Sequence, residues 1–579
     1  MIASLSGARW RVRGAPPEAE TRRLARGAGI HPLVAAVLHG RGLVSKAAIL
    51  DFLGNPDPGA LHDPLLLRGM EEAVARIIMA RETGERVLVH GDYDVDGVTS
   101  AVLVTRALQL IGVSRVTCRI PHRIRDGYGL GPSAAQTAEA GNYGLLIAVD
   151  CGTNDLEAVE ELNHRGVDVL ILDHHLPGPQ LPRALALINP RQEGCRYPFT
   201  DLCSAGLAFK LAQALHLALQ RPFNAPAYAS VAALGTVADL VSLEDENRLL
   251  VRLGLPHLGQ AASPGLRELL RVSGVEEGRP PTAGQVGYHL GPRINAAGRI
   301  DSAEVAARLL LTADEDEARE IARQLDLLNA RRRLQETELV EQLTAMLQQD
   351  PALLDERILV LDGSGWPRGV IGIAASRLVE AYHRPAVVIS RDDTSGHGSC
   401  RSIKGFNITG ALEQSAADLL QRFGGHAMAA GLTVAAERIP QLRKRLQEHC
   451  RTHLDEDLLV RRITADAEAR PAEIDRGLAD DLSRLEPHGM GNPRPVFLVR
   501  GLRLEGEPRL LKDQHLKLRL SGEGAGFDAL WWRSAELLPG LTSAAGGLDV
   551  LARVEINRWG GRESVQLNVS DARPAADSR

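Results

Sequence analysis

Cysteine is scarce in this sequence, and its spacing shows no metal-binding or redox pattern. The six cysteines are scattered, and no Cys-x-x-Cys pair occurs. This spacing disfavours structural zinc, a dithiol redox motif and a disulfide framework. We therefore expect the chain to work in a reducing cytoplasm. The cysteines are Cys118, Cys151, Cys195, Cys203, Cys400 and Cys450.

Long apolar runs and a positive net charge are also missing. The sequence contains no run of about 18 uncharged apolar residues, and its N-terminus carries arginines without the apolar core of a signal peptide. We expect a soluble protein that is neither exported nor inserted in a membrane. The net charge of −6 argues against a uniformly basic protein that coats nucleic acid, although it leaves room for local basic patches.

The 579 residues exceed what a single hydrophobic core supports and predict about three or four domains. We divide the chain into an N-terminal segment (1–70), an α/β domain (71–302), a connecting helix (303–350), a smaller α/β domain (351–455), a β domain (456–573) and a tail (574–579). Within 303–350 the helical stretch runs from about Ala303 to Gln349 without Gly or Pro.

Helices and strands alternate between residues 71 and 172. Strands are predicted at 86–90, 116–120, 145–150 and 167–172, and helices at 71–81, 98–111, from 132, and at 156–165. Several of these strands are nearly continuous apolar runs, as expected when helices cover both faces of a parallel sheet. The pattern predicts a doubly wound α/β domain.

The second half of the chain contains a further α/β pattern, followed by a series of short strands. In the smaller α/β domain we predict strands at 357–361 and 386–389, a turn at 395–400 rich in Gly and Ser, and helices at 372–381 and 408–421. From about residue 460, short alternating strands at 515–520, 527–531, 548–556 and 563–569 predict a small β-barrel.

Acidic residues collect where three predicted strands of the first domain end. Asp92, Asp94 and Asp96 follow the first strand, Asp150 ends another, and Asp173-His174-His175 end a third. Ligands of doubly wound sheets bind beyond the carboxyl ends of the strands. Carboxylates so close together repel one another unless cations neutralise them. The sequence therefore predicts a metal site at this edge.

The first acidic turn also resembles the start of an EF-hand calcium loop. That loop needs a bidentate Glu at its twelfth position, where this chain has Leu103, and it lies between two helices rather than after a strand. We therefore disfavour calcium. Asp and His without Cys favour Mn²⁺ or Mg²⁺, with Zn²⁺ as an alternative, and two such ions suit the hydrolysis of phosphate esters.

Five segments of the sequence together resemble the DHH phosphoesterase superfamily. They are His-Gly-Asp-Tyr-Asp-Val-Asp-Gly at 90–97, Val-Asp-Cys-Gly at 149–152, Asp-His-His at 173–175, Gly-Thr-Val-Ala-Asp at 235–239, and Gly-Gly-His-Ala-Met-Ala-Ala-Gly at 424–431. The last resembles the signature of the associated DHHA1 domain. Within the superfamily the chain resembles the RecJ family of single-strand-specific 5′-to-3′ exonucleases over most of its length.

This resemblance implies a set of metal ligands and supporting residues. It implies metal ligands at His90, Asp94, Asp96, Asp150, His174 and Asp239. Asp92 and Asp173 are expected to orient these ligands. His175 is expected to face the scissile phosphate or the leaving group as a hydrogen-bond donor or acid. The cofactor would be Mn²⁺ or Mg²⁺ in a site for two ions.

The resemblance also implies contacts with single-stranded DNA. The family uses the positions of Arg123, Ser399 and Arg401 around the 5′ phosphate, and those of Arg293, Asn295 and Arg299 along the backbone. Gly424, Gly425 and His426 are expected near the active site. In the expected OB-like barrel, Trp531, Trp532 and Trp559 either stack on bases or fill the core. Strand alternation places Trp531 and Trp532 on opposite faces, so that one can be exposed.

The sequence leaves two alternatives to a DNA exonuclease that releases 5′-mononucleotides in recombination and repair. One is a phosphodiesterase for short oligonucleotides or cyclic dinucleotides, which the residues after about 450 disfavour. The other is a non-catalytic replication scaffold, which the intact ligand set disfavours. The family implies a single-strand-binding protein and a helicase as partners, and we take a monomer as the default state.

Overall fold

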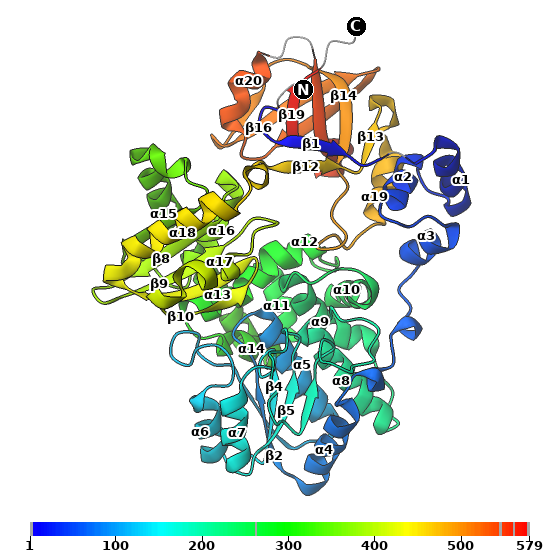
Figure 1. Ribbon diagram of the computed structural model, residues 1–579. Helices are drawn as coiled ribbons and strands as arrows, with labels where there is room; N and C mark the ends of the chain where they lie inside the picture. The colour runs from blue at the N-terminus through cyan, green and yellow to red at the C-terminus, as the bar shows by residue number, and fades with distance from the viewer. Residues whose placement is uncertain (1–3, 15, 261–262, 544–546, 560–561, 576–579) are drawn as a thin grey trace. The chain divides into compact units, whose positions relative to one another are not determined.

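The structure is a computed structural model that describes residues 4–14, 16–260, 263–543, 547–559 and 562–575. It divides into two compact units (Figure 1). The first comprises Asn55–Leu334 together with Pro487–Pro493, and the second comprises the remaining three stretches of the chain. In the described part of the chain, no helix is both long enough and apolar enough to cross a membrane.

The first unit is built on a parallel sheet with the strand order β3-β2-β4-β5-β6. Its strands are β2 (Arg86–His90), β3 (Arg115–Arg119), β4 (Leu145–Val149), β5 (Asp168–Leu172) and β6 (Ala186–Ile188). Around it lie α4 (Met70–Thr83), α5 (Val95–Ile111), α6 (Pro132–Ala140), α7 (Leu156–His164), α8 (Ser204–Ala218), α9 (Ala225–Ala238), α10 (Asp245–Leu258), α11 (Pro264–Val272), α13 (Gly291–Ile300) and α14 (Glu304–Leu311).

Both faces of this sheet are covered by helices, as the apolar strands predict. In β2, Val87 and Val89 join the core formed with α4, α5 and α8. Leu88, between them, joins the core formed with α6 and α7. Each fully buried Val or Leu side chain contributes about 1.5–3 kcal/mol to folding. The doubly wound α/β architecture is confirmed.

The two helices nearest the acidic turns differ from their predicted extents. α5 begins at Val95 rather than 98, because Asp94 caps its N-terminus. The predicted helix from Ala303 to Gln349 is interrupted: α14 ends at Leu311, Thr312 is extended, and α15 (Glu315–Gln349) begins after Asp314. The backbone N–H of Glu317 is donated to the Asp314 carboxylate at 2.7 Å, which starts the new helix. The segment 303–350 therefore contains two helices rather than one.

The smaller α/β domain of the second unit has a sheet with the order β10-β11-β9-β8-β7. It contains β7 (Leu359–Ser364), α16 (Ile371–Tyr382), β8 (Ala386–Arg391), β9 (Ser395–Arg401), α17 (Ile408–Ala416), β10 (Leu420–His426), β11 (Ala429–Ala435) and α18 (Ile439–His453). The helix predicted over 408–421 ends at Ala416. A short 3-10 helix follows at Ala417–Leu419, and β10 begins at Leu420.

The predicted turn at 395–400 is wrong, because these residues form β9 in the middle of this sheet. Its glycines allow close packing. A Cβ atom on Gly396 would lie 2.8 Å from Ile389, and one on Gly398 would lie 2.8 Å from Leu432. Gly396 and Gly398 are thus strand residues whose lack of a side chain leaves room for Ile389 and Leu432.

The C-terminal strands close into a barrel. β14 (Phe497–Leu504), β18 (Leu548–Trp559), β19 (Arg562–Pro574), β17 (Ala525–Trp531) and β16 (His515–Gly522) pair in that order, and β16 pairs back to β14. This ring is the OB-like barrel that the sequence predicted. Trp531 is buried in its core and Trp532 is 52% exposed, as alternation predicts. The side chain of Trp559 lies outside the described residues.

The N-terminal helices pack with the barrel rather than forming a core of their own. α1 (Glu18–Ala28), α2 (Pro32–Gly40) and α3 (Lys46–Leu53) share one hydrophobic cluster with the barrel strands and α19 (Arg476–Ser483). β1 (Arg9–Val12) pairs in parallel with β12 (Arg462–Ala465). The division into six segments made from the sequence is finer than these two units and stays a prediction.

Candidate metal and phosphodiesterase site

The first acidic turn folds back on the N-terminus of α5. The Asp94 carboxylate caps this helix by accepting the N–H of Gly97 at 3.1 Å. A Cβ atom on Gly97 would lie 2.5 Å from the backbone N and O of Asp92. Only glycine fits this turn, which brings Asp92, Asp94 and Asp96 to the carboxyl end of β2.

Asp96 is held by the N-terminus of α8. Its two carboxylate oxygens accept the backbone N–H groups of Ser204 and Ala205, each at 2.8 Å. The positive end of a helix favours a carboxylate at this position. Burial, followed by the charge of Asp94, nevertheless raises the pKa of Asp96 to about 6. The Asp96 carboxylate is therefore held in a fixed orientation, but its two N–H donors do not offset the effect of burial and of Asp94 on its pKa.

Asp150 follows β4 in a left-handed backbone conformation, with φ of +63°. This conformation is uncommon for non-glycine residues, and Asp is among those that tolerate it best. The Ser204 hydroxyl donates to its carboxylate at 3.1 Å. Burial, and next the charge of Asp96, raise the pKa of Asp150 well above its ordinary value.

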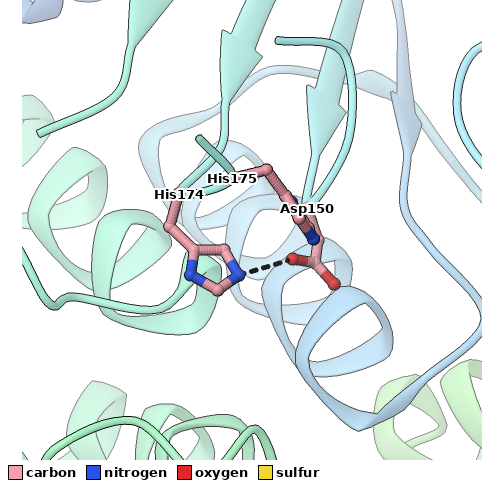
Figure 2. Close-up of side chains that lie close together, drawn as sticks. All are labelled: Asp150, His174 and His175. Atoms are coloured by element: carbon pink, nitrogen blue, oxygen red, sulfur yellow. Dashed lines mark ion pairs between the residues drawn. The ribbon is translucent and has the colours of Figure 1, made fainter. Parts of the chain in front are cut away.

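His174 lies at the centre of the cluster. Its Nε2 atom is 3.3 Å from Oδ1 of Asp150 (Figure 2), 3.6 Å from Oδ2 of Asp239 and 3.9 Å from Oδ2 of Asp96. Asp239 is the C-cap of α9, and burial, followed by Asp96, raises its pKa to about 8. The ends of β2, β4, β5 and α9 thus meet at one imidazole.

Glycine allows α9 to come this close. A Cβ atom on Gly235 would lie 2.6 Å from Ala205 Cβ, 2.6 Å from Thr99 Oγ1 and 2.7 Å from Asp96 Oδ1. The first residue of the Gly-Thr-Val-Ala-Asp segment therefore has a packing role beside the cluster, and its last residue supplies the carboxylate.

Three overlapping groups of side chains could each hold a cation. In each group the potential ligand atoms lie within 4.8 Å of one another. The groups are Asp92, Asp94 and Asp150; Asp96, His174 and Asp239; and Asp150, His174 and His175. Atom Oδ1 of Asp92 is buried and has no hydrogen-bond partner in the described part of the chain. This hard donor set fits Mn²⁺ or Mg²⁺.

His90 lies outside these three groups. It is buried at the end of β2, and burial lowers its pKa to about 4. The imidazole is therefore neutral, the form in which histidine binds metal. Asp92 belongs to one of the three groups, whereas His90 belongs to none.

His175 is fixed by the residue two positions before it. Its Nδ1 atom is 2.7 Å from Oδ1 of Asp173, which also accepts the backbone N–H of His174 at 2.7 Å. Burial alone would lower the pKa of His175, but Asp173 outweighs burial and raises it to about 9. The hydroxyl of Tyr128 lies 3.2 Å from His175 Nε2. Sequence reasoning assigned no role to Tyr128 or to Ser204.

The helix that carries three predicted DNA contacts packs against the first acidic turn. A Cβ atom on Gly298 of α13 would lie 2.7 Å from the backbone oxygen of Tyr93. The guanidinium of Arg123 lies 4.8 Å from the centre of the Tyr93 ring. Arg293 is paired with Asp326 at 2.8 Å. The close packing at Gly298 holds the segment from Arg293 to Arg299 next to the turn.

The remaining predicted contacts belong to the second unit. In β9, Arg401 Nη1 donates to Ser399 Oγ at 3.1 Å. A Cβ atom on Gly372, near the start of α16, would lie 2.9 Å from Ser399 Oγ and 3.0 Å from Arg401 Nη2. Ser399 and Arg401 therefore lie at a helix N-terminus, a setting that favours anions. Sequence reasoning missed Gly372.

Gly424, Gly425 and His426 form the end of β10 and pair with β11. Gly425 has φ of +147°, and a Cβ atom there would lie 2.3 Å from the backbone oxygen of Ala429. The backbone at this position requires glycine. The structure therefore accounts for Gly425 by strand packing.

Comparison with known proteins gives consistent matches along the chain. Models of the DHH family N-terminal domain, the DHHA1 domain and the RecJ OB domain match residues 86–236, 355–452 and 465–571. The single-stranded-DNA-specific exonuclease RecJ of Bacillus subtilis is 36% identical over 97% of this chain and 70% of its own length. The Escherichia coli protein of that name is 34% identical, with 88% and 91% covered.

The chain belongs to the RecJ family. A crystal structure of Thermus thermophilus RecJ in complex with Mn²⁺ matches it with a TM-score of 0.83 and 32% identity, and the match covers 98% of this chain and 80% of the other. A structure of the same protein with Mg²⁺ matches with a TM-score of 0.77. The RecJ family thus includes structures that hold the two ions favoured by the donor set described above.

Proposed function

We propose that this chain is a metal-dependent exonuclease that degrades single-stranded DNA from the 5′ end and releases 5′-mononucleotides, in recombination and repair. The observation that carries the proposal is the convergence of Asp96, Asp150 and Asp239 on His174, in a member of the RecJ family. The hydrolysed bond is a phosphodiester.

Each predicted site residue receives a role in this proposal. Asp94, Asp96, Asp150, His174 and Asp239 would ligate Mn²⁺ or Mg²⁺, with His90 as a further ligand. Two bound ions supply Lewis-acid activation of water and stabilise charge on the phosphate. Asp92 and Asp173 would support these ligands, and Asp173 does so by accepting the backbone N–H of the ligand His174.

The protein's own groups orient the reaction. The N–H groups of Ser204 and Ala205 fix the Asp96 carboxylate, and the Ser204 hydroxyl fixes Asp150. Asp173 raises the pKa of His175 to about 9, which favours the protonated imidazole. We propose that its Nε2 atom donates a proton to the leaving 3′ oxygen, while Asp173 keeps Nδ1 in place.

The 5′-to-3′ direction of degradation would be set by binding of the 5′ phosphate of the strand. Ser399 and Arg401 are joined by a hydrogen bond near the start of α16, which supports their role as a phosphate anchor. The role of Arg123 at the 5′ phosphate is proposed from the family resemblance. Arg293, Asn295 and Arg299 would contact the backbone of the strand. Gly424, Gly425 and His426 complete the predicted contacts, and the exposed Trp532 is available for stacking on a base.

The wider setting is also a proposal. We propose the DHH, connecting-helix, DHHA1 and OB-like divisions at 71–302, 303–350, 351–455 and 456–573, with the preceding segment and the tail outside them. A cytoplasmic location and a monomeric state, together with a single-strand-binding protein and a helicase as partners, are proposed from the sequence and the family resemblance.

The decisive experiment supplies the purified protein and Mn²⁺ with a long single strand labelled at either end, a duplex of the same sequence and a cyclic dinucleotide. We expect label to be released first from the 5′ end of the single strand. Release from the 3′ end, or faster hydrolysis of the cyclic dinucleotide, would overturn the proposal. Binding of single strands without hydrolysis would favour the non-catalytic scaffold.

A further inference from the structure

A short turn from the C-terminal half of the chain belongs to the first compact unit. Pro487–Pro493 lies between α19 and β14, both of which are in the second unit, yet it is grouped with Asn55–Leu334. Its carbonyl at Met490 accepts the backbone N–H of Leu243 at 2.8 Å. Leu243 lies in the loop between α9 and α10, four residues after Asp239. We call Pro487–Pro493 the 487–493 turn.

The 487–493 turn holds its own shape. The side chain of Asn492 is buried, and its Nδ2 atom donates to the backbone oxygen of Pro487 at 2.8 Å. The N–H of Gly489 is donated to the backbone oxygen of Asn492 at 3.0 Å. A buried amide that links both ends of a turn rigidifies it, since breaking the bond would leave polar groups unpaired.

Two glycines bring the turn into contact with the loop after Asp239. A Cβ atom on Gly489 would lie 2.7 Å from Leu243 Cδ1. Gly491 has φ of +74°, and a Cβ atom there would lie 2.3 Å from Ser242 Oγ and 2.9 Å from Glu244 Cγ. A Cβ atom at either position would require these side chains of the loop to move.

The Asp239 carboxylate has fewer fixed contacts than the carboxylates of Asp96 and Asp150. Asp96 accepts two backbone N–H groups and Asp150 accepts the Ser204 hydroxyl. Among the described residues, the Asp239 carboxylate has an ion pair with His174 at 3.6 Å and no hydrogen bond from a fixed donor. Its position therefore follows from the backbone that carries it.

We propose that the 487–493 turn is a positioning element for the metal site, which holds the loop after Asp239 so that its carboxylate faces His174. This inference rests on the proposed function, because it assigns Asp239 to metal binding. The turn is covalently continuous with the barrel strands, so a segment outside the DHH-like domain would set the metal affinity of that domain.

The test measures Mn²⁺ binding to the full-length protein, by the loss of the electron paramagnetic resonance signal of free Mn²⁺. Partners that orient metal ligands typically contribute about tenfold or more to affinity. Gly491→Ala and Asn492→Ala should each weaken Mn²⁺ binding about tenfold. Asn492→Ala adds no steric clash, so it remains informative if Gly491→Ala folds poorly.

Gly506→Ala is the matched control. Gly506 has φ of +70°, close to that of Gly491, but a Cβ atom there would meet nothing within 4 Å. It therefore reproduces the backbone strain without the contact, and Mn²⁺ binding should match that of the wild type.

Wild-type Mn²⁺ affinity in both Gly491→Ala and Asn492→Ala would overturn the inference, as would an equal loss in Gly506→Ala. The wild-type exonuclease assay decides the proposed function separately. An active wild type with unaffected Mn²⁺ binding in the variants would refute the positioning role alone.

Discussion

Atom Nε2 of His174 lies 3.3 Å from Oδ1 of Asp150, although the two residues follow different strands, β5 and β4 (Figure 2). β4 and β5 are parallel neighbours with Val149 paired to Leu172, so the residues just beyond them meet at one edge. This contact places an imidazole nitrogen among carboxylates from three other segments. The predictions below follow from that arrangement.

Asp150→Asn should reduce nucleotide release from single-stranded DNA by about a thousandfold or more, because losing a ligand removes several kcal/mol of stabilisation of the transition state by the metal ions. The assay is the release of labelled nucleotides in Mn²⁺. Glu160→Gln on the exposed face of α7 is the control and should remain fully active. Substantial activity in Asp150→Asn would contradict the ligand assignment.

The metal should stabilise the protein more at high pH than at low pH. Burial raises the pKa of Asp96 to about 6 and that of Asp239 to about 8 in the folded chain. Their contribution to stability is complete below the ordinary pKa of about 4 and is lost as pH rises through the raised values. Bound cations offset that loss.

The measurement compares the melting temperature with Mn²⁺ and with EDTA at about pH 5.5 and about pH 8. We expect the difference between the two conditions to be larger at the higher pH. A difference that is the same at both values would show that these carboxylates are not the groups that the metal neutralises.

Arg401→Ala should weaken binding of 5′-phosphorylated oligonucleotides more than binding of 5′-hydroxyl ones, because Arg401 and Ser399 are proposed to hold the terminal phosphate. A charge-assisted contact contributes about 1.5–3 kcal/mol, which corresponds to about 10- to 100-fold in affinity. The control is Arg445→Ala on α18, which breaks an exposed ion pair with Asp418. Equal losses for both oligonucleotides would make Arg401 a general backbone contact.

Gly235→Ala should destabilise the protein by about 1–3 kcal/mol, because the added methyl group would overlap Ala205, Thr99 and Asp96. Urea denaturation followed by circular dichroism measures the change in midpoint. Gly284→Ala is the comparison, since its Cβ atom would meet only Thr282 Oγ1, at 3.7 Å. If both variants unfold at the wild-type midpoint, the protein can accommodate a methyl group at Gly235, which would contradict the close packing there.

The local patterns of the chain were sufficient for much of the fold. The apolar run at 86–90 predicted both ends of β2 correctly. The exposure of Trp532 next to the buried Trp531 follows from strand alternation. The glycines of β9 led to the wrong prediction of a turn at 395–400. Gly396 and Gly398 look like turn residues until the neighbouring strands show that their size is what allows packing.

The sequence by itself determined which residue types stand after which strands, and therefore the acids and histidines of the candidate metal site. Only the tertiary structure decided how these groups are held: Ser204 and Ala205 orient Asp96, and the 487–493 turn contacts the loop after Asp239. The physical reason is that strand periodicity is a local property of the chain. Contacts between segments hundreds of residues apart depend on the packing of the whole unit.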